Sequence, residues 1–234
     1  MEHLVALPQY DVLAYLIVGL AAIAACDLIY RKRVFFRGDW GISVGSTIVI
    51  AAYVVGHIIA VFSTVVIEGY IVGPWMAPVV HLMAQPCDKS DGSRLSYFAP
   101  LECNTQNKIK EKIKRDDKNR TLEGSILFWE AYNTAKQDEH AFERIVTFHQ
   151  LYNFSRNMSF ASFLAAVAVL IQLFRRRTAS ENNTAVEYGL PAWLQNRGWQ
   201  FIAFLFVGCV LFSRYLYFYR AHTIEILTSY AYGH

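Results

Sequence analysis

The stretch from Ile42 to Ile67 constrains this chain most, because it is apolar and carries no Asp, Glu, Lys or Arg until Glu68. A helix needs about 20 mostly apolar residues to cross the roughly 30 Å hydrocarbon core of a bilayer. Helices of soluble proteins seldom run this far without a charge, because one of their faces meets water. Residues 42–67 are therefore expected to form a membrane-spanning helix.

Three further stretches are similar in character, at residues 12–30, 158–174 and 199–219. The third of the four is close to the shortest length that spans a bilayer, and Arg214 interrupts the last turns of the fourth. Only 18% of the chain is charged, whereas an average soluble domain is nearer a quarter. The alternative for each stretch is a buried helix of a soluble protein, but four together favour lipid. The sequence predicts an all-α membrane protein, a bundle of four transmembrane helices.

Residues that favour the membrane–water interface flank these stretches. Trp199 opens the fourth, and the amphipathic rings of tryptophan and tyrosine prefer the level of the lipid headgroups. Arg214 can extend its charge from the helix end into water, so an interfacial anchor is expected there rather than a voltage sensor. The other predicted anchors follow the first and third spans: Arg31, Lys32, Arg33, Arg175, Arg176 and Arg177.

The same basic clusters set the expected orientation, because short loops rich in Lys and Arg stay in the cytoplasm. The long loop after the second span also holds many basic residues, but long loops cross the membrane largely regardless of charge. Both termini and residues 73–157 are therefore expected outside the cytoplasm, with the chain in a plasma or bacterial inner membrane. Residues 1–11 contain no Lys or Arg, so the first stretch is expected to be a retained helix rather than a signal peptide.

The chain is expected to divide into three segments: spans one and two in residues 1–72, a mostly helical exterior domain in 73–157, and spans three and four with a short tail in 158–234. In the exterior domain a helix is expected to start near Asp138. No Gly or Pro follows before the third span, so helix and span are predicted to be continuous. Such a rigid link would couple events in the exterior domain to the bundle.

Cys87 and Cys103 both fall in the exterior domain, where an oxidising compartment lets disulfides persist. A bridge between them would stabilise the domain by about 3 kcal/mol. The alternative is two unpaired thiols.

Ionisable residues inside a membrane are costly and are therefore functional candidates. His57 lies in the middle of the second span, and Glu68 lies about 16 Å further along nearly the same face. A histidine and a carboxylate on one polar stripe suggest a proton or ion path, although they are too far apart to share one metal ion. The alternative for His57 is a neutral ring bonded to a neighbouring helix.

The sequence contains no phosphate-binding loop, dinucleotide fingerprint, nucleophile elbow, HExxH motif or paired CxxC. Arg144 and His149 have an R-x4-H spacing that also occurs in a class of helical ribonucleases, but neither flank supports the match. The net charge of +3 gives no argument for nucleic acid as a partner. The chain is therefore predicted not to be an enzyme and to need no metal or cofactor.

Small residues continue along one face of the second span, at Ala51, Ala52, Gly56 and Ala60. Such faces let helix backbones approach closely in lipid, so tight packing is expected within or between subunits.

Two interpretations of function remain at this point. The first is a membrane component that senses, scaffolds or assembles with itself or another membrane protein through its exterior domain. The alternative is an oligomeric pore or ion-conducting protein lined by His57 and Glu68. Small membrane-disrupting effectors of bacterial defence systems share this size and architecture, which is an analogy of shape alone. The partner common to both is the lipid bilayer, and the sequence does not tell whether a small molecule also binds.

Overall fold

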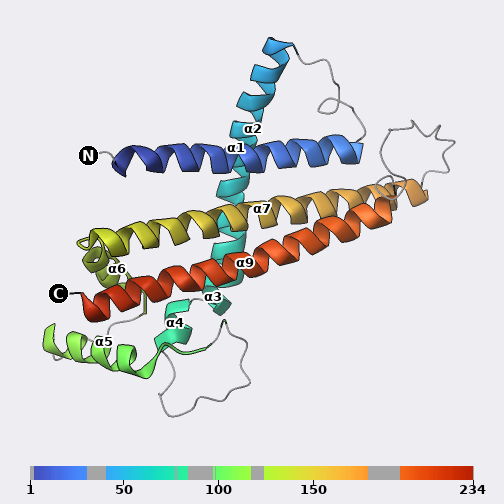
Figure 1. Cartoon of the computed structure of the whole chain (residues 1–234). Helices are drawn as coiled ribbons and strands as arrows, with labels where there is room; N and C mark the ends of the chain where they lie inside the picture. Colours follow the sequence, from blue (N-terminus) through green and yellow to red (C-terminus); the bar gives the residue numbers. More distant parts are fainter. Residues whose placement is uncertain are drawn as a thin grey trace. The chain divides into compact units, whose positions relative to one another are not determined.

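A computed structural model of the chain describes residues 3–30, 41–76, 78–83, 97, 99–116, 124–178 and 196–233. The secondary-structure elements of these residues are helices, as predicted (Figure 1). The chain divides into two compact units. Unit 1 consists of residues 1–67 and 154–213, and unit 2 consists of residues 68–153 and 214–234.

Three helical stretches among the described residues are long and apolar enough to cross a membrane: Ile42–Met83, Glu139–Arg175 and Arg197–Tyr232. They contain the predicted second, third and fourth spans. The first predicted span lies in α1 (His3–Tyr30), whose apolar part, Ala14–Tyr30, is shorter than the other three. Three membrane-length helices are therefore confirmed by length and composition, and the fourth span stays a prediction.

Several helices extend beyond the apolar stretches that predicted them. α2 (Ile42–Ser63) continues into a π-helix, η1 (Thr64–Val72), and then into α3 (Gly73–Met76); α4 (Pro78–Met83) follows. Glu68 was expected to mark the end of a span, yet it lies inside η1. A single carboxylate ends an apolar stretch without breaking the backbone hydrogen bonds of a helix. Hydropathy therefore located these helices but not their ends.

In unit 1, α1 and α2 cross with their backbones in contact. A Cβ atom placed on Gly19 would collide with the carbonyl oxygen of Ala52, and one placed on Gly56 would collide with that of Tyr15. Only glycine permits this approach. The small-residue face predicted on the second span therefore forms a helix crossing, as expected from its composition.

One buried core cluster among the described residues of unit 1 joins three helices. Ile29 of α1 packs with Ala165 and Val169 of α7 (Glu139–Thr178), and Phe201 of α9 (Arg197–Tyr232) packs against them. Many large apolar side chains of this unit remain exposed, among them Val61 at 63% and Phe206 at 68%. Soluble monomers rarely expose apolar surface of this extent, which is usual for helices that face lipid.

Unit 2 has a core of large aliphatic side chains. α5 (Cys103–Asp116) contributes Ile109, α6 (Gly124–Ala135) contributes Leu127, and α7 and α9 contribute Ile145 and Ile226. The buried amide of Gln106 donates to the carbonyl oxygens of Leu82 and Leu101, at 2.9 and 3.0 Å. This bonding holds the segment before α5 against α4. Unit 2 is therefore packed like a soluble domain.

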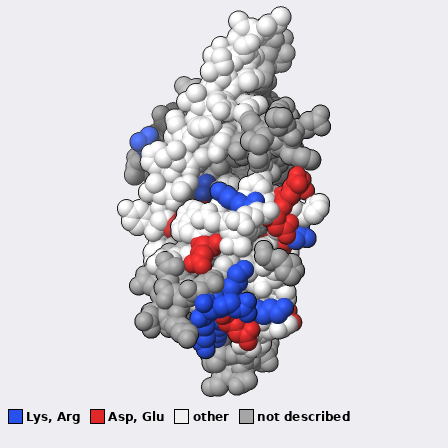
Figure 2. Space-filling view, turned by 90° about the vertical axis from the view of Figure 1, so that its left-hand side faces the viewer, with Lys and Arg blue, Asp and Glu red and all other residues white. Residues whose placement is uncertain are grey.

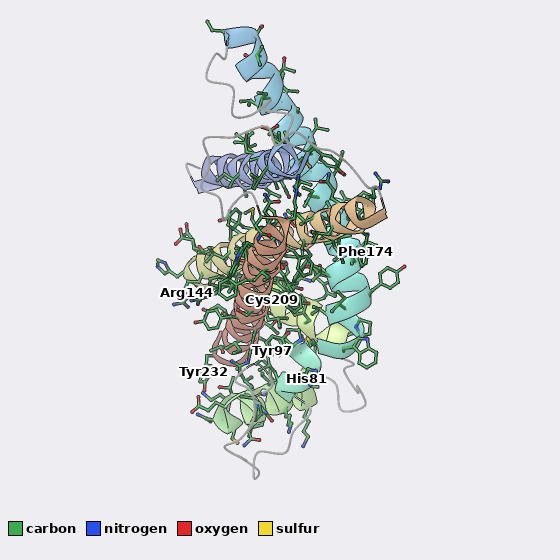
Figure 3. The ribbon with its side chains drawn as sticks, turned by 90° about the vertical axis from the view of Figure 1, so that its right-hand side faces the viewer. His81, Tyr97, Arg144, Phe174, Cys209 and Tyr232 are labelled. Atoms are coloured by element: carbon green, nitrogen blue, oxygen red, sulfur yellow. The ribbon has the colours of Figure 1, made fainter. Side chains whose placement is uncertain are left out.

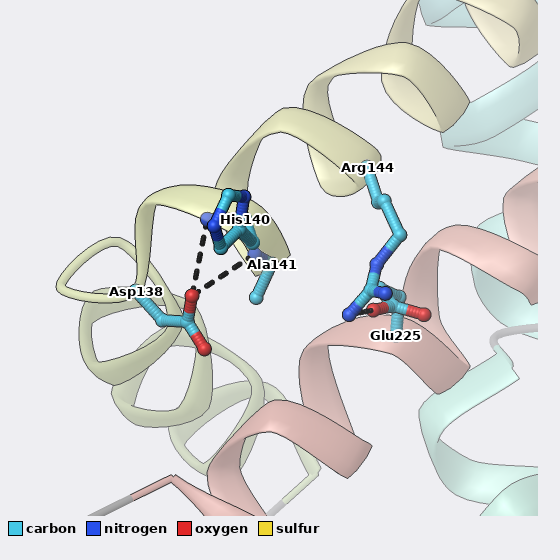
Figure 4. Close-up of polar contacts among 5 residues, drawn as sticks. All are labelled: Asp138, His140, Ala141, Arg144 and Glu225. Carbon is cyan, nitrogen blue, oxygen red and sulfur yellow. Dashed lines mark hydrogen bonds and ion pairs between the residues drawn. The ribbon is translucent and has the colours of Figure 1, made fainter.

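The start of α7 is fixed by a side-chain cap. The Asp138 carboxylate accepts hydrogen bonds from the backbone N–H groups of His140 and Ala141, at 3.1 and 3.2 Å (Figure 4). These groups have no partner inside the helix, which is why Asp is favoured at this position. The predicted start of a helix near Asp138 is confirmed.

α7 and α9 each contribute residues to both units. α7 has 40 residues and α9 has 36, so they are about 60 and 54 Å long, roughly twice the hydrocarbon thickness. The predicted continuity of helix and span across residues 154–158 is confirmed. α9 also continues past the expected end of the fourth span at residue 219, because its last turns enter the core of unit 2.

Candidate functional site

In unit 2 a group of histidine and tyrosine side chains joins α7 to α9. We call it the histidine–tyrosine cluster; its members are His149, Tyr152, Tyr215, Tyr219 and His222. The Tyr152 hydroxyl and His149 Nδ1 are 2.9 Å apart, and the centroid of the His222 ring lies 5.6 Å from that of His149 and 5.4 Å from that of Tyr152. The ring of Tyr219 is stacked against that of Tyr215 at 5.7 Å. Spacings of three and four residues place these side chains on one face of each helix.

His222 is the least satisfied member of this cluster. It is 4% exposed, and neither ring nitrogen has a hydrogen-bond partner among the residues that the structure describes. A buried polar group without a partner costs about 1–3 kcal/mol, and such groups are rare in folded proteins. Aromatic side chains contact the His222 ring instead. One of them is Phe128 of α6, whose ring centroid lies 6.2 Å from that of His222. Protonating His222 would bury a charge beside a second imidazole, which is costly.

An ion pair joins the same two helices about one turn away from the cluster. Arg144 of α7 lies 2.8 Å from the Glu225 carboxylate of α9 (Figure 4). The Arg144 side chain is 64% exposed, so the pair contributes only about 0–1 kcal/mol. Of the R-x4-H residues, Arg144 is thus bound to Glu225, and His149 is bound to Tyr152.

A second contact holds the segment near residue 99 to α9. The Arg220 guanidinium donates to the carbonyl oxygen of Ala99 at 3.0 Å, and the Tyr97 hydroxyl donates to that of Met76 at 2.7 Å. Burial, together with the neighbouring Tyr219, raises the pKa of the Tyr97 phenol. Tyr97, labelled in Figure 3, therefore stays protonated and can donate its hydrogen bond near neutral pH.

In unit 1 a buried polar group joins α7 to α2. We call it the arginine–asparagine cluster; it consists of Ser63, Arg156 and Asn157, which are 0%, 6% and 1% exposed. Nε of Arg156 donates to the Ser63 hydroxyl at 3.1 Å, and Nη2 donates to the Asn157 carbonyl oxygen at 3.2 Å. The Ser63 hydroxyl also donates to Asn157. Arg156 is thus a buried cation, and burying a charge is costly unless it is hydrogen-bonded, as it is here.

One turn further along α7, Ser159 donates to the backbone carbonyl of Gly208 on α9 at 2.9 Å. A Cβ atom on Gly208 would lie 2.7 Å from the ring of Phe163, so a larger residue there would require the Phe163 ring to shift. α7 is therefore bound by polar side chains to both α2 and α9 within unit 1.

His57, predicted to line a path, lies on α2 in unit 1. Its ring contacts that of Tyr15 on α1 at 4.2 Å and that of Tyr53 at 4.7 Å. Glu68 lies in η1, is half-buried, and belongs to unit 2. The structure thus places the two residues in different units, and the ion path stays a prediction.

The predicted disulfide is not tested. Cys103 is the first residue of α5 and is half-buried, whereas Cys87 lies outside the described residues. A bridge between them stays a prediction.

Some of the predicted interface anchors lie among the described residues. Trp199 lies in the first turn of α9 and is 56% exposed, and Arg214 and Arg175 are exposed on α9 and α7. Arg176 and Arg177 belong to the last turn of α7. The three anchors expected after the first span, Arg31, Lys32 and Arg33, lie outside the described residues.

Sequence reasoning missed both polar clusters. Asn157 and Arg156 precede the apolar stretch at residue 158, so they were assigned to the end of the exterior domain. A usable signal was the repetition of Ser155, Ser159 and Ser162 at helical spacing across that boundary. His222 follows a run of aromatic residues and was assigned to a short tail. In neither case does the sequence indicate which helix the side chain contacts.

No known protein family, curated protein or solved structure matches this chain.

Proposed function

We propose that this chain is a non-enzymatic membrane component whose helical domain senses or assembles, and that α7 and α9 transmit the event to the membrane bundle. The observation that supports it most is the continuity of these two helices, each of which contributes residues to both units. A continuous helix resists bending, so a displacement at one end reaches the other.

Each unit carries a polar cluster that includes residues of α7 and is suited to such a role. In unit 2 the histidine–tyrosine cluster fixes the spacing of α7 and α9 through aromatic rings and one hydrogen bond. In unit 1 Arg156 and Asn157 bind Ser63 of α2, next to the π-helix that begins at Thr64. π-Helical turns often occur at functional sites. A shift of α7 would therefore displace α2 through these hydrogen bonds.

The proposed topology has four spans, with α1 as the first. Both termini and residues 73–157 lie outside the cytoplasm, and a disulfide joins Cys87 to Cys103. The arginine-rich turn at the end of α7 is consistent with a cytoplasmic end there. A reporter that is active only in the cytoplasm should be inactive when fused to the C-terminus.

Hydrogen exchange on the protein in lipid nanodiscs tests the coupling. His222→Trp overfills the histidine–tyrosine cluster, so we expect faster amide exchange in unit 2 and also around Ser63 in α2. The matched control is Trp129→Ala on α6, whose side chain is 61% exposed and lies on neither long helix. It should leave exchange in α2 unchanged.

A second variant separates transmission from general unfolding. Two glycines at Phe154 and Ser155 soften α7 at about 1 kcal/mol each. Combined with His222→Trp, they should restrict the exchange response to unit 2. If His222→Trp changes exchange in unit 2 alone when α7 is intact, transmission through the long helices is excluded.

The second candidate is an oligomeric pore lined by His57 and Glu68. Two observations favour it: His57 is exposed on α2, and a Cβ atom on Gly41 or Gly45 would meet nothing within 4 Å, which leaves room for a second copy. Ion leakage from liposomes should then fall when His57 and Glu68 are replaced. A strictly monomeric protein contradicts this candidate, because one copy has too few helices to enclose an aqueous path.

A further inference from the structure

A basic hollow lies between α5 and the last turn of α9 in unit 2. It has a volume of about 650 Å³, which is in the range of small-molecule sites. It is lined on α5 by Lys108, Glu111, Lys112 and Arg115, at the end of α9 by Ala231 and Tyr232, and just after α9 by Gly233. Three cations thus meet one carboxylate.

The sequence of α5 explains why the charges gather there. Ile109 and Ile113 turn into the core of unit 2, which leaves the intervening basic residues on the remaining faces of the helix. Lys108, Lys112 and Arg115 are spaced by four and three residues, so they share one face. Figure 2 shows a cluster of basic side chains in the lower part of this face, with acidic side chains beside it and other basic side chains elsewhere on the face.

The three cations of the hollow differ in the contacts that they make within the protein. The Lys112 ammonium donates to the backbone carbonyl of Tyr230 at 2.9 Å and so caps the end of α9. The Lys108 ammonium lies 3.8 Å from the centroid of the Tyr232 ring, at the end of α9 labelled in Figure 3. Arg115 is exposed and has no hydrogen bond or ion pair to any residue that the structure describes. The cap on α9 thus accounts for the position of Lys112, but it does not account for Lys108 or Arg115.

We propose that this hollow binds a phosphate-bearing anion. Arg115 and Lys108 supply charge-assisted hydrogen bonds to the phosphate oxygens, and guanidinium groups match phosphate geometry in particular. Lys112 neutralises the carbonyl groups at the end of α9, which would otherwise repel an anion.

Two sources provide this chemistry, a soluble nucleotide-like molecule and the headgroup of an anionic lipid. The proposal gives the helical domain a ligand class, but it does not depend on transmission through α7 and α9. Binding and hydrogen-exchange coupling are separate measurements, so either can fail alone.

The experiment uses the full chain in phosphatidylcholine nanodiscs with ATP and pyrophosphate as probes, measured by calorimetry and thermal shift. Lys108→Gln combined with Arg115→Gln should weaken probe binding by at least about tenfold, because it removes two charge-assisted contacts. The matched control is Lys110→Gln with Lys114→Gln. These lysines are exposed on the same helix and do not line the hollow, and the change in net charge is identical. The control should stay within about twofold of the parent chain.

The second arm measures recruitment of phosphatidylglycerol vesicles by the same nanodiscs. If the source is a lipid headgroup, ATP and pyrophosphate fail to bind, and recruitment is lost in the Lys108/Arg115 variant but kept in the control. If both variants weaken every probe equally, binding reflects overall charge and the proposal is overturned. Absence of binding in both arms also overturns it. Helical content by circular dichroism confirms that each variant is folded.

Discussion

The two units of this chain are built by different packing rules. In unit 1 backbone meets backbone where Gly19 and Gly56 let α1 cross α2. In unit 2 the core contains large aliphatic side chains such as Ile109 and Leu127. Helices in lipid gain little from burying apolar surface and associate through close packing and polar contacts, whereas a domain in water is held by apolar burial. We propose from this contrast that lipid surrounds unit 1 and water surrounds unit 2.

α7 and α9 follow both rules along their own length. In unit 1 α7 meets α9 through Ser159 and Gly208, a small and polar contact. In unit 2 the same helices meet through Ile145 and Ile226 and through the histidine–tyrosine cluster. A single helix can thus serve lipid and water if its sequence changes character midway.

The largest expected effect comes from filling the helix crossing of unit 1. Gly56→Leu places a side chain where the backbone of Tyr15 lies, so we expect a loss of about 3 kcal/mol or more, largest in unit 1. Thermal unfolding and hydrogen exchange in nanodiscs measure it. Gly45→Leu is the control, because a Cβ atom there meets nothing within 4 Å. Equal losses in both variants would remove the distinction between the units.

The corresponding change in unit 2 deletes core side-chain volume. Leu127→Ala should cost about 2–5 kcal/mol, because Leu127 is 3% exposed and its loss leaves a cavity. Exchange should accelerate in α5 and α6. The control is Ile126→Ala, one residue away and 46% exposed, which should cost under about 1 kcal/mol. A small effect at Leu127 would show that unit 2 lacks a soluble-type core.

A smaller effect, of opposite sign, is expected from His222→Phe. The change keeps a ring among aromatic neighbours and removes two buried nitrogens without partners, so stability should rise by about 1 kcal/mol. His149→Phe is the matched variant and should lower stability by a similar amount, because Tyr152 loses its hydrogen bond. Thermal unfolding of the two variants measures both changes in stability. A loss in His222→Phe would show that the imidazole has a partner in solution.

The smallest effect is expected from Arg144→Gln. The pair with Glu225 is exposed on the arginine side, so its removal should cost under about 1 kcal/mol at low salt. The difference should vanish near 1 M salt, where the screening length falls to about 3 Å. A larger or salt-independent loss would make this ion pair a structural element of unit 2.

Sequence alone predicted the parts of this fold that follow from periodicity and charge. The apolar stretch from Ile42 gave α2, the missing helix breakers after Asp138 gave the continuity of α7, and small residues such as Gly56 gave the helix crossing. Each of these is a local property of consecutive residues.

What sequence could not give depends on which distant residues meet. Nothing near His222 indicates that His149 lies beside it, because the two belong to helices 73 positions apart. Arg156 likewise finds Ser63 across a separation of 93 residues. The candidate residues His57 and Glu68 were chosen because they share one helix. The clusters that join different helices could not be predicted from the sequence.

The central claim is that unit 1 is solvated by lipid and unit 2 by water, and spin-label accessibility in nanodiscs tests it most directly. Labels replacing Val61 and Phe206 of unit 1 should collide with oxygen far more than with a water-soluble nickel complex. Labels replacing Lys110 and Trp129 of unit 2 should show the reverse preference. If all four labels meet the nickel complex equally, unit 1 is not embedded in a bilayer and the account is wrong.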